Sequence, residues 1–225
     1  MPTAAAAPVR AGLSRPQAVL FDWDNTLADN WASIHAALAA AFTAMGQEPW
    51  TLAETRQRVR QSLRDSFPAL FGPRWPQARE IFYAHFEARH LEHLQPLPGA
   101  EKLLRALSEA GIYLALVSNK TGPYLRKEAE ALGWSGFFGA LVGATDAPAD
   151  KPDPAPVHQA LAPAGLAPSA SVWFVGDTDI DLQCAHASGC LPVLVGPDNP
   201  FAHEFFAPAL HVRDCLSLCD LVRAL

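Results

Sequence analysis

Short apolar runs recur along the chain, and each ends at or just before a glycine or a polar residue. They cover residues 18–21, 112–117, 141–143, 172–175 and 191–195. Runs of this length are typical of strands that are buried on both faces of a parallel sheet. Amphipathic segments lie between most of them, such as residues 101–110, which end at Gly111. This alternation predicts an α/β fold with a Rossmann-like, doubly wound parallel sheet.

One connection in this pattern is too long. A strand–helix–strand unit needs about 30 residues, and the chain from Phe21 to Ile112 is about three times that length. The surplus is helical, because apolar residues repeat at helical spacing from Trp31 to Met45. Thr51 and Glu54 can form a capping box for a second helix. A third helix is expected at about residues 76–94.

The chain therefore divides into three parts. The stiff segment of residues 95–99 is rich in Pro and Gly, as expected at a domain boundary. We expect a small α-helical cap domain at residues 29–97, inserted into a core formed by residues 17–28 and 98–225. The Ala- and Pro-rich residues 1–16 are expected to form a flexible tail.

Two aspartates directly follow the first predicted strand, in the segment Phe21-Asp22-Trp23-Asp24-Asn25-Thr26-Leu27. Carboxylates two residues apart on an extended strand end point the same way and repel each other unless a cation or a shared proton compensates. Asp22 is placed to attack phosphorus, and Asp24 to transfer protons. Thr26 could steady the loop or Asp24 by a hydrogen bond. Alternatively, the acids only cap the next helix.

A second acidic segment follows the apolar run at residues 172–175, with Asp177, Asp179 and Asp181 close together. Oxygen ligands of this kind suit Mg²⁺, which takes one or two carboxylates together with water and substrate phosphate. We expect Asp177 to be a direct ligand, Asp181 to act indirectly, behind the ligands or through a water molecule, and Asp179 to be a bystander. Acids that favour a helix N-terminus are the alternative.

Two weaker signals complete the set. Ser118 and Asn119 follow the predicted strand at residues 112–117, and Lys151 stands in a loop that contains Pro152 and Pro154. A hydroxyl, an amide and a fixed cation are the groups that bind a phosphoryl group during its transfer. Singly, Ser118 also suits a turn and Lys151 a solvated surface.

Composition excludes other classes of function. The chain has 17 Lys and Arg residues against 23 Asp and Glu residues, a net charge of −6, so no nucleic-acid or anionic-membrane partner is expected. No apolar run approaches the length of a membrane span. The cysteines, at positions 184, 190, 215 and 219, form no C-x-x-C pair, which favours reduced thiols and a cytoplasmic location.

Taken together, the order and spacing of these motifs resemble those of the haloacid dehalogenase-like hydrolase superfamily. Its motifs are D-x-D-x-T, a Ser or Thr at a strand end, a Lys, and a G-D-x-x-x-D element, and the match runs from Asp22 to Asp181. A helical cap between the first two motifs resembles the branch of phosphoglycolate phosphatase and β-phosphoglucomutase. In such folds the Asp22 strand is central. Trp23 and Asn25 depart from the usual residues, Asn25 replacing a common Gly.

The resemblance implies a Mg²⁺-dependent phosphatase that acts through an aspartyl-phosphate. The partner would be a small phosphorylated metabolite, either phosphoglycolate-like or a sugar or nucleotide phosphate. Asp22 would be both nucleophile and metal ligand. Asp24 would be the general acid and base, with its backbone carbonyl on the metal.

The remaining motif residues take supporting roles in the same resemblance. Ser118 would hold a phosphoryl oxygen, with Asn119 and Thr26 beside it as phosphate-binding candidates. Lys151 would neutralise the charge of the nucleophile and the phosphoryl group. Asp177 and Asp181 would anchor the cation.

Individual residues narrow the choice of reaction without fixing the substrate. Asp24 argues against a dehalogenase, and the absence of lysine from residues 31–97 argues against a phosphonoacetaldehyde hydrolase. A phosphosugar mutase and a non-catalytic binding module stay open. Arg56, Arg60 and Arg64 would share one helical stripe, where Arg60 and Arg64 could bind a second anionic group of the substrate. A solvated basic face is the alternative.

Overall fold

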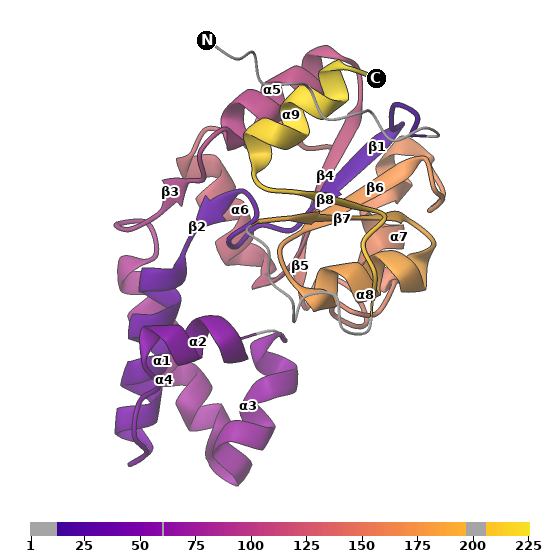
Figure 1. Ribbon diagram of the computed structural model, residues 1–225. Coiled ribbons are helices and arrows are strands. Elements are labelled where there is room, and N and C mark those ends of the chain that lie inside the picture. The colour runs from indigo at the N-terminus through magenta and orange to yellow at the C-terminus, as the bar shows by residue number, and fades with distance from the viewer. Residues whose placement is uncertain (1–12, 60, 197–205) are drawn as a thin grey trace.

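The computed structural model describes residues 13–59, 61–196 and 206–225. Figure 1 shows a sheet with helices on both faces and a separate group of helices beside it. Of the expected tail, residues 1–12 lie outside the described residues. Residues 13–16 do not behave as a tail throughout, because Leu13 packs partly against the core and Pro16 is buried.

The described residues form one six-stranded parallel sheet with the strand order β5-β4-β1-β6-β7-β8. Its strands are β1 (Ala18–Phe21), β4 (Tyr113–Thr121), β5 (Ala140–Ala144), β6 (Val172–Gly176), β7 (Leu191–Val195) and β8 (Leu210–Val212). β1 pairs with β4 on one side and with β6 on the other. The doubly wound α/β fold predicted from the apolar runs is confirmed.

Each face of the sheet is covered by helices. Val19 and Phe21 lie in one apolar cluster, and Ala18 and Leu20 lie in the other, because successive strand residues point to opposite faces. The first cluster includes residues of α5 (Ala100–Glu109), α6 (Gly122–Ala131) and α9 (Cys215–Arg223). The second includes residues of α7 (Ala155–Leu161) and α8 (Asp179–Ser188). Short 3₁₀ turns follow α6 and α7 at Ser135–Phe137 and Ala162–Ala164.

The chain between β2 (Ala28–Asp29) and β3 (Gln95–Pro96) is helical. Its elements are α1 (Trp31–Ala44), α2 (Leu52–Arg58), α3 (Leu63–Phe71), a 3₁₀ turn (Gly72–Arg74) and α4 (Trp75–Arg89). We call residues 30–94 the helical insert. It has its own apolar cluster, which includes Phe42, Phe67 and Phe82. β2 and β3 pair antiparallel, so the chain leaves and re-enters the sheet region side by side.

Two helix predictions in the insert need correction. The third predicted helix ends at Arg89 rather than near residue 94. The arginine stripe does not lie on one helix, because α2 ends at Arg58, Val59 is extended, and Ser62 opens α3. The side chain of Ser62 donates to Asp65 at 3.0 Å, which stabilises the new start. The capping box of Thr51 and Glu54 is confirmed.

Among the described residues, no helix has the length and apolar character needed to cross a membrane.

Candidate active site

The residues singled out in the sequence gather at one edge of the sheet. Asp22 and Asp24 follow β1, Ser118 lies near the end of β4, and Asp177 follows β6. The carboxyl ends of parallel strands form the usual ligand-binding edge of such a sheet. All four residues line one pocket, and side chains of the helical insert such as Trp31, Phe82, Tyr83 and Phe86 line it as well.

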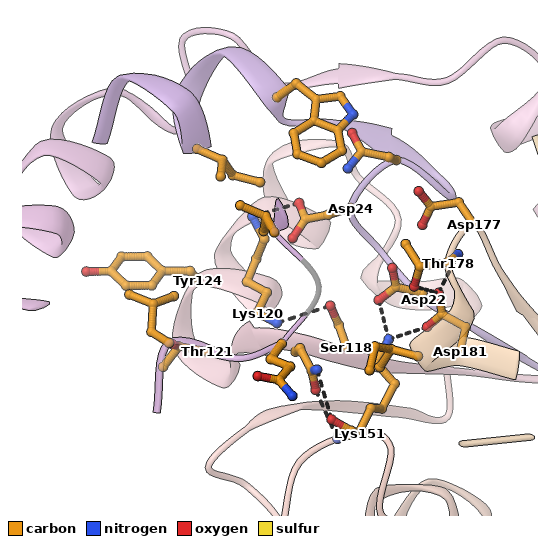
Figure 2. A pocket seen from close by; sticks show the side chains of 18 of the residues that line it. Asp22, Asp24, Ser118, Lys120, Thr121, Tyr124, Lys151, Asp177, Thr178 and Asp181 are labelled. Carbon is orange, nitrogen blue, oxygen red and sulfur yellow. Dashed lines mark hydrogen bonds and ion pairs between the residues drawn. The ribbon is translucent and has the colours of Figure 1, made fainter. Parts of the chain in front are cut away.

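Lys151 links two of the acids. Its Nζ lies 2.7 Å from Asp22 Oδ1 and 2.7 Å from Asp181 Oδ1. Dashed lines in Figure 2 mark both contacts. All three side chains are buried or nearly so. Burial alone would lower the pKa of the Lys151 ammonium, but the charges of Asp181 and Asp22 outweigh it and raise the pKa. Lys151 is therefore a fixed positive charge beside Asp22.

Asp22, Asp177 and Asp181 form a compact group of carboxylates. One oxygen of each lies within 4.8 Å of the others, and their side chains point into a common space in Figure 2. Burial raises the pKa of Asp22 to about 6, with Asp181 and Asp24 adding to the rise and Lys151 opposing it. Burial, together with Asp181 and Asp22, also raises the pKa of Asp177 well above its ordinary value. Asp179 is not part of this group.

This arrangement fits a hard divalent cation. Three clustered carboxylates supply the oxygen donors that Mg²⁺ prefers, and a bound cation would relieve the repulsion between their charges. Asp181 is also oriented by the backbone N–H and the hydroxyl of Thr178, which donate to its Oδ2 at 3.0 and 2.7 Å.

Asp24 lies in a different environment, on the side of the pocket that faces α6. Its Oδ1 accepts from Asn30 Nδ2 at 2.7 Å and lies 3.0 Å from Lys120 Nζ. Burial raises the pKa of Asp24, Lys120 opposes the rise, and the nearby charge of Glu128 adds to it. A raised pKa suits a carboxyl group that gives and takes a proton.

Two predicted phosphate-binding residues serve the site in another way. Thr26 is fully buried and its hydroxyl donates to Asp177 Oδ1 at 3.2 Å, so it holds an acid in place instead of contacting Asp24. The amide of Asn119 donates to the Lys151 carbonyl at 3.1 Å and accepts from the Lys151 N–H at 3.0 Å. Asn119 thus fixes the loop that carries Lys151.

Ser118 lies in the pocket, as its place after the strand predicted. The pairing of β4 with β5 shifts register between Val117 and Thr121 of β4. Residues 118–120 lie in this irregular stretch and line the pocket. The Ser118 side chain accepts from the Lys120 N–H at 3.2 Å. Its hydroxyl hydrogen stays available for a phosphoryl oxygen.

Of the two insert arginines predicted to bind the substrate, Arg60 lies outside the described residues. Arg64 is paired with Asp150, with Nη2 at 2.7 Å from Oδ1 and Nε at 3.1 Å from Oδ2. It does not line the pocket that holds Asp22. Arg64 therefore joins the insert to the loop beside Lys151.

Sequence reasoning missed three connected residues near Asp24: Lys120 contacts Asp24, Glu128 contacts Lys120, and His90 contacts Glu128. Lys120 follows Ser118 and Asn119 directly, yet it was given no role. Glu128 carried a usable signal, because it stands three residues after Leu125 and next to Ala129 on the buried face of α6. An acid on an apolar face needs a partner. His90 carried a similar signal, because it stands at helical spacing from the buried Phe82 and Phe86 of α4.

Comparison with known proteins gives consistent results. The family model described as haloacid dehalogenase-like hydrolase matches residues 19–195. A phosphoglycolate phosphatase of Cereibacter sphaeroides is 33% identical over 183 residues, covering 76% of this chain and 81% of that protein.

Solved structures extend the similarity to the fold. A HAD-superfamily hydrolase from Ehrlichia chaffeensis aligns with a TM-score of 0.66 and 29% identity, covering 95% of this chain and 98% of that one. A haloacid dehalogenase-like family protein from Streptococcus pneumoniae aligns with a TM-score of 0.79 and 24% identity, covering 90% and 96%. The second likeness concerns the fold alone.

Proposed function

Because the chain belongs to the haloacid dehalogenase-like hydrolase family and is a hydrolase of phosphoric monoesters, we propose that it uses Mg²⁺ and a phosphorylated Asp22 to cleave a small phosphomonoester. The observation that carries this proposal is the geometry around Asp22. The carboxylate is held by a buried lysine inside a group of three acids, and Asp24 stands two residues away at the same pocket. This set supplies a nucleophile, a fixed cation and a proton donor.

Asp22, Asp177 and Asp181 would hold the cation, and the Asp24 carbonyl would join them as the family resemblance implies. When bound, Mg²⁺ would neutralise charge on the phosphoryl oxygens. Lys151, which contacts both Asp22 and Asp181, would do the same, and Ser118 would donate to a phosphoryl oxygen.

The first step transfers the phosphoryl group to Asp22. Lys151 holds Oδ1 of Asp22, so we assign the attack on phosphorus to Oδ2. A bond forms between Oδ2 and phosphorus while the bond from phosphorus to the leaving oxygen breaks. Asp24 gives its proton to that oxygen, and an alcohol departs.

The second step restores the enzyme. Asp24, now a carboxylate, takes a proton from water as the water oxygen attacks phosphorus. The bond between phosphorus and Asp22 breaks and inorganic phosphate leaves. We propose that the helical insert acts as a cap over this reaction, because its aromatic side chains line the same pocket and would limit the access of water.

The first test is hydrolysis of p-nitrophenyl phosphate with and without Mg²⁺. We expect turnover with Mg²⁺ and its loss when a chelator removes the metal. Full activity in the presence of the chelator would contradict the role given to the cation, and no turnover with any divalent metal would contradict the proposal as a whole.

The second test replaces the nucleophile. Asp22→Asn keeps the size of the side chain but removes the charged oxygen, so we expect activity to fall at least about 100-fold with the thermal unfolding midpoint little changed. Asp179→Asn is the matched control, since Asp179 lies outside the acid group, and it should stay active. Equal activity of Asp22→Asn and wild type would refute the nucleophile assignment.

The substrate is to be found among small phosphate esters. The curated relative named above is a phosphoglycolate phosphatase, so phosphoglycolate is the first candidate, followed by sugar phosphates and nucleoside monophosphates.

The four cysteines are free and buried, which supports our proposal of a reducing, cytoplasmic setting.

A further inference from the structure

Glu128 is a carboxylate in the interior of the protein. It lies on α6 with no exposed surface and accepts from four side chains. Its Oε1 lies 2.9 Å from Lys120 Nζ and 2.7 Å from His90 Nδ1. Its Oε2 lies 2.6 Å from Trp23 Nε1 and 3.1 Å from Asn30 Nδ2. Burial raises the pKa of Glu128, but Lys120 and these hydrogen bonds outweigh it, so the net pKa is lowered.

Two of these four donors also contact Asp24. The Asn30 amide nitrogen lies 2.7 Å from Asp24 Oδ1 and 3.1 Å from Glu128 Oε2, so its two N–H groups serve both carboxylates. Lys120 Nζ lies 3.0 Å from Asp24 Oδ1 and 2.9 Å from Glu128 Oε1. Glu128 thus holds Asn30 and Lys120 in place, and both of these contact Oδ1 of Asp24. The other oxygen of Asp24, Oδ2, can then face the pocket.

Two of the four donors, Asn30 and His90, come from opposite ends of the helical insert. Asn30 is the N-cap of α1, where the insert begins, and His90 is the C-cap of α4, where its last helix ends. An ionised carboxylate only accepts hydrogen bonds, so His90 carries its proton on Nδ1 in this pair. Glu128 thus accepts hydrogen bonds from both ends of the insert and from Trp23, which follows Asp22 in the chain.

We propose that Glu128 is a positioning residue that holds Lys120 and Asn30 so that Asp24 presents one oxygen to the leaving group of the substrate. This inference rests on the proposed function, since it assumes that Asp24 protonates the leaving oxygen. It differs from a purely structural role, in which Glu128 only satisfies buried donors. A structural role predicts equal losses with all substrates, and a positioning role predicts losses that depend on the leaving group.

The test compares two substrates in Glu128→Gln. An alkyl phosphate such as phosphoglycolate releases an alcohol and needs a proton, whereas p-nitrophenyl phosphate releases a stable phenolate and needs little help. The ratio kcat/KM reports the step in which the leaving group departs, before water attacks. General acid catalysis contributes about 100-fold or more, so we expect kcat/KM to fall about tenfold or more with the alkyl substrate and about twofold with the aryl substrate.

The control is Glu130→Gln, an exposed glutamate on the same helix, which should leave both values unchanged. Equal losses with both substrates in Glu128→Gln, or no loss with either, would overturn the inference. If wild type hydrolysed neither substrate, the proposed function would be overturned instead. The failure of the inference and the failure of the proposed function are therefore distinguishable.

A second variant guards against misfolding. Glu128→Gln removes one of the two carboxylates that pair with the buried Lys120 ammonium, which is destabilising, whereas Glu128→Gln with Lys120→Met removes both the Glu128 and the Lys120 charge. Under the inference, the double variant folds and still loses the alkyl substrate selectively, because Asp24 has lost its grip. If the double variant folded and its ratio of kcat/KM between the alkyl and the aryl substrate equalled that of wild type, the inference would be overturned.

Discussion

Trp23 and Asn25 explain how a short loop presents two aspartates to one pocket. Trp23 is fully buried and packs edge-on against Trp134, with ring centroids 5.9 Å apart, so the residue between the two aspartates belongs to the core. Asn25 has φ of 63°, in the left-handed region that asparagine tolerates better than most residues. A backbone of this kind accounts for the Gly that is common in the family at this position.

Gly176 is required by the close approach of Asp181. A Cβ atom at position 176 would lie 2.2 Å from Asp181 Cγ and 2.3 Å from its Cβ. We expect Gly176→Ala to displace Asp181 from Lys151 and from the acid group, and to weaken activation by Mg²⁺ about tenfold or more. A titration of activity against Mg²⁺ concentration measures this.

Gly136→Ala is the control for this prediction, because a Cβ at position 136 meets nothing within 4 Å and should leave Mg²⁺ activation unchanged. If the two variants responded to Mg²⁺ alike, the assignment of Asp181 to the metal site would be wrong.

At the scale of single residues, the sequence predicts which side chains meet but not how they bond. Asp22 and Asp177 could be placed together because both follow strands of one parallel sheet. The partners of Thr26 and Asn119 could not be predicted, because they are distant in the chain. The hydrogen bond of Thr26 spans 151 positions and that of Asn119 spans 32. Such contacts depend on the folded arrangement of loops, and local patterns carry no record of them.

At the scale of elements, α9 is stabilised at its start by Asp214. The side chain of Asp214 accepts from the Ser217 N–H at 2.7 Å, and this bond lowers its pKa. We expect Asp214→Ala to lower the free energy of unfolding by about 1 kcal/mol at neutral pH. Chemical denaturation measures the difference.

The pH dependence of this effect has a defined sign. Because the folded pKa of Asp214 is lowered, its contribution is complete above the ordinary pKa of aspartate and is lost as the pH falls through the lowered value. Asp214→Asn should stay close to wild type at neutral pH, since asparagine also caps helices well. A loss in the Ala variant that persisted undiminished at acidic pH would contradict the part of this stabilisation that depends on the charge of Asp214.

Most elements could be predicted from the sequence, and the exceptions have physical reasons. Continuous apolar runs identified the five longest strands of the sheet. β8 has only three residues, two of them half-buried, so its pattern is too short to recognise. The start of α3 was missed because Arg56, Arg60 and Arg64 keep helical spacing in the sequence across Val59, although the backbone is extended at Val59.

At the scale of the whole molecule, the helical insert is attached to the core by polar contacts near the pocket. Tyr83 and Thr121 share a hydrogen bond of 2.5 Å between their oxygens. Arg64 pairs with Asp150, whose side chain is 1% exposed. These contacts join α4 to the last residue of β4 and α3 to the loop that follows β5.

We expect Arg64→Ala to destabilise the protein and loosen the insert, because it leaves the buried Asp150 carboxylate without its counter-charge. The arginine side chain is 41% exposed, so water moderates the effect to about 1–2 kcal/mol. Thermal unfolding gives the stability, and limited proteolysis within the insert reports its attachment.

The matched control is Arg105→Ala, which breaks the pair with Glu101 on the surface of α5, where both side chains are more than half exposed. This change should cost less than about 0.5 kcal/mol. If both variants lost the same stability and resisted protease alike, the link between Arg64 and Asp150 would have no special role.

The presence of an insert could be predicted from one overlong connection, but its placement could not. Arg64 and Asp150 are 86 positions apart, and neither stands in a motif. The docking of the insert results from such distant pairs and from aromatic packing, which a pattern of apolar spacing does not encode.

The antiparallel pairing of β2 and β3 has a consequence beyond this chain. Ala28 stands opposite Pro96 and Asp29 opposite Gln95, so the two ends of the intervening segment are already neighbours. A shorter, longer or unrelated segment could be grafted between these points without rerouting the strands that carry the aspartates. Such an exchange would keep the strands in place, but it would need to retain Asn30 and His90, which contact Glu128 from the two ends of the insert.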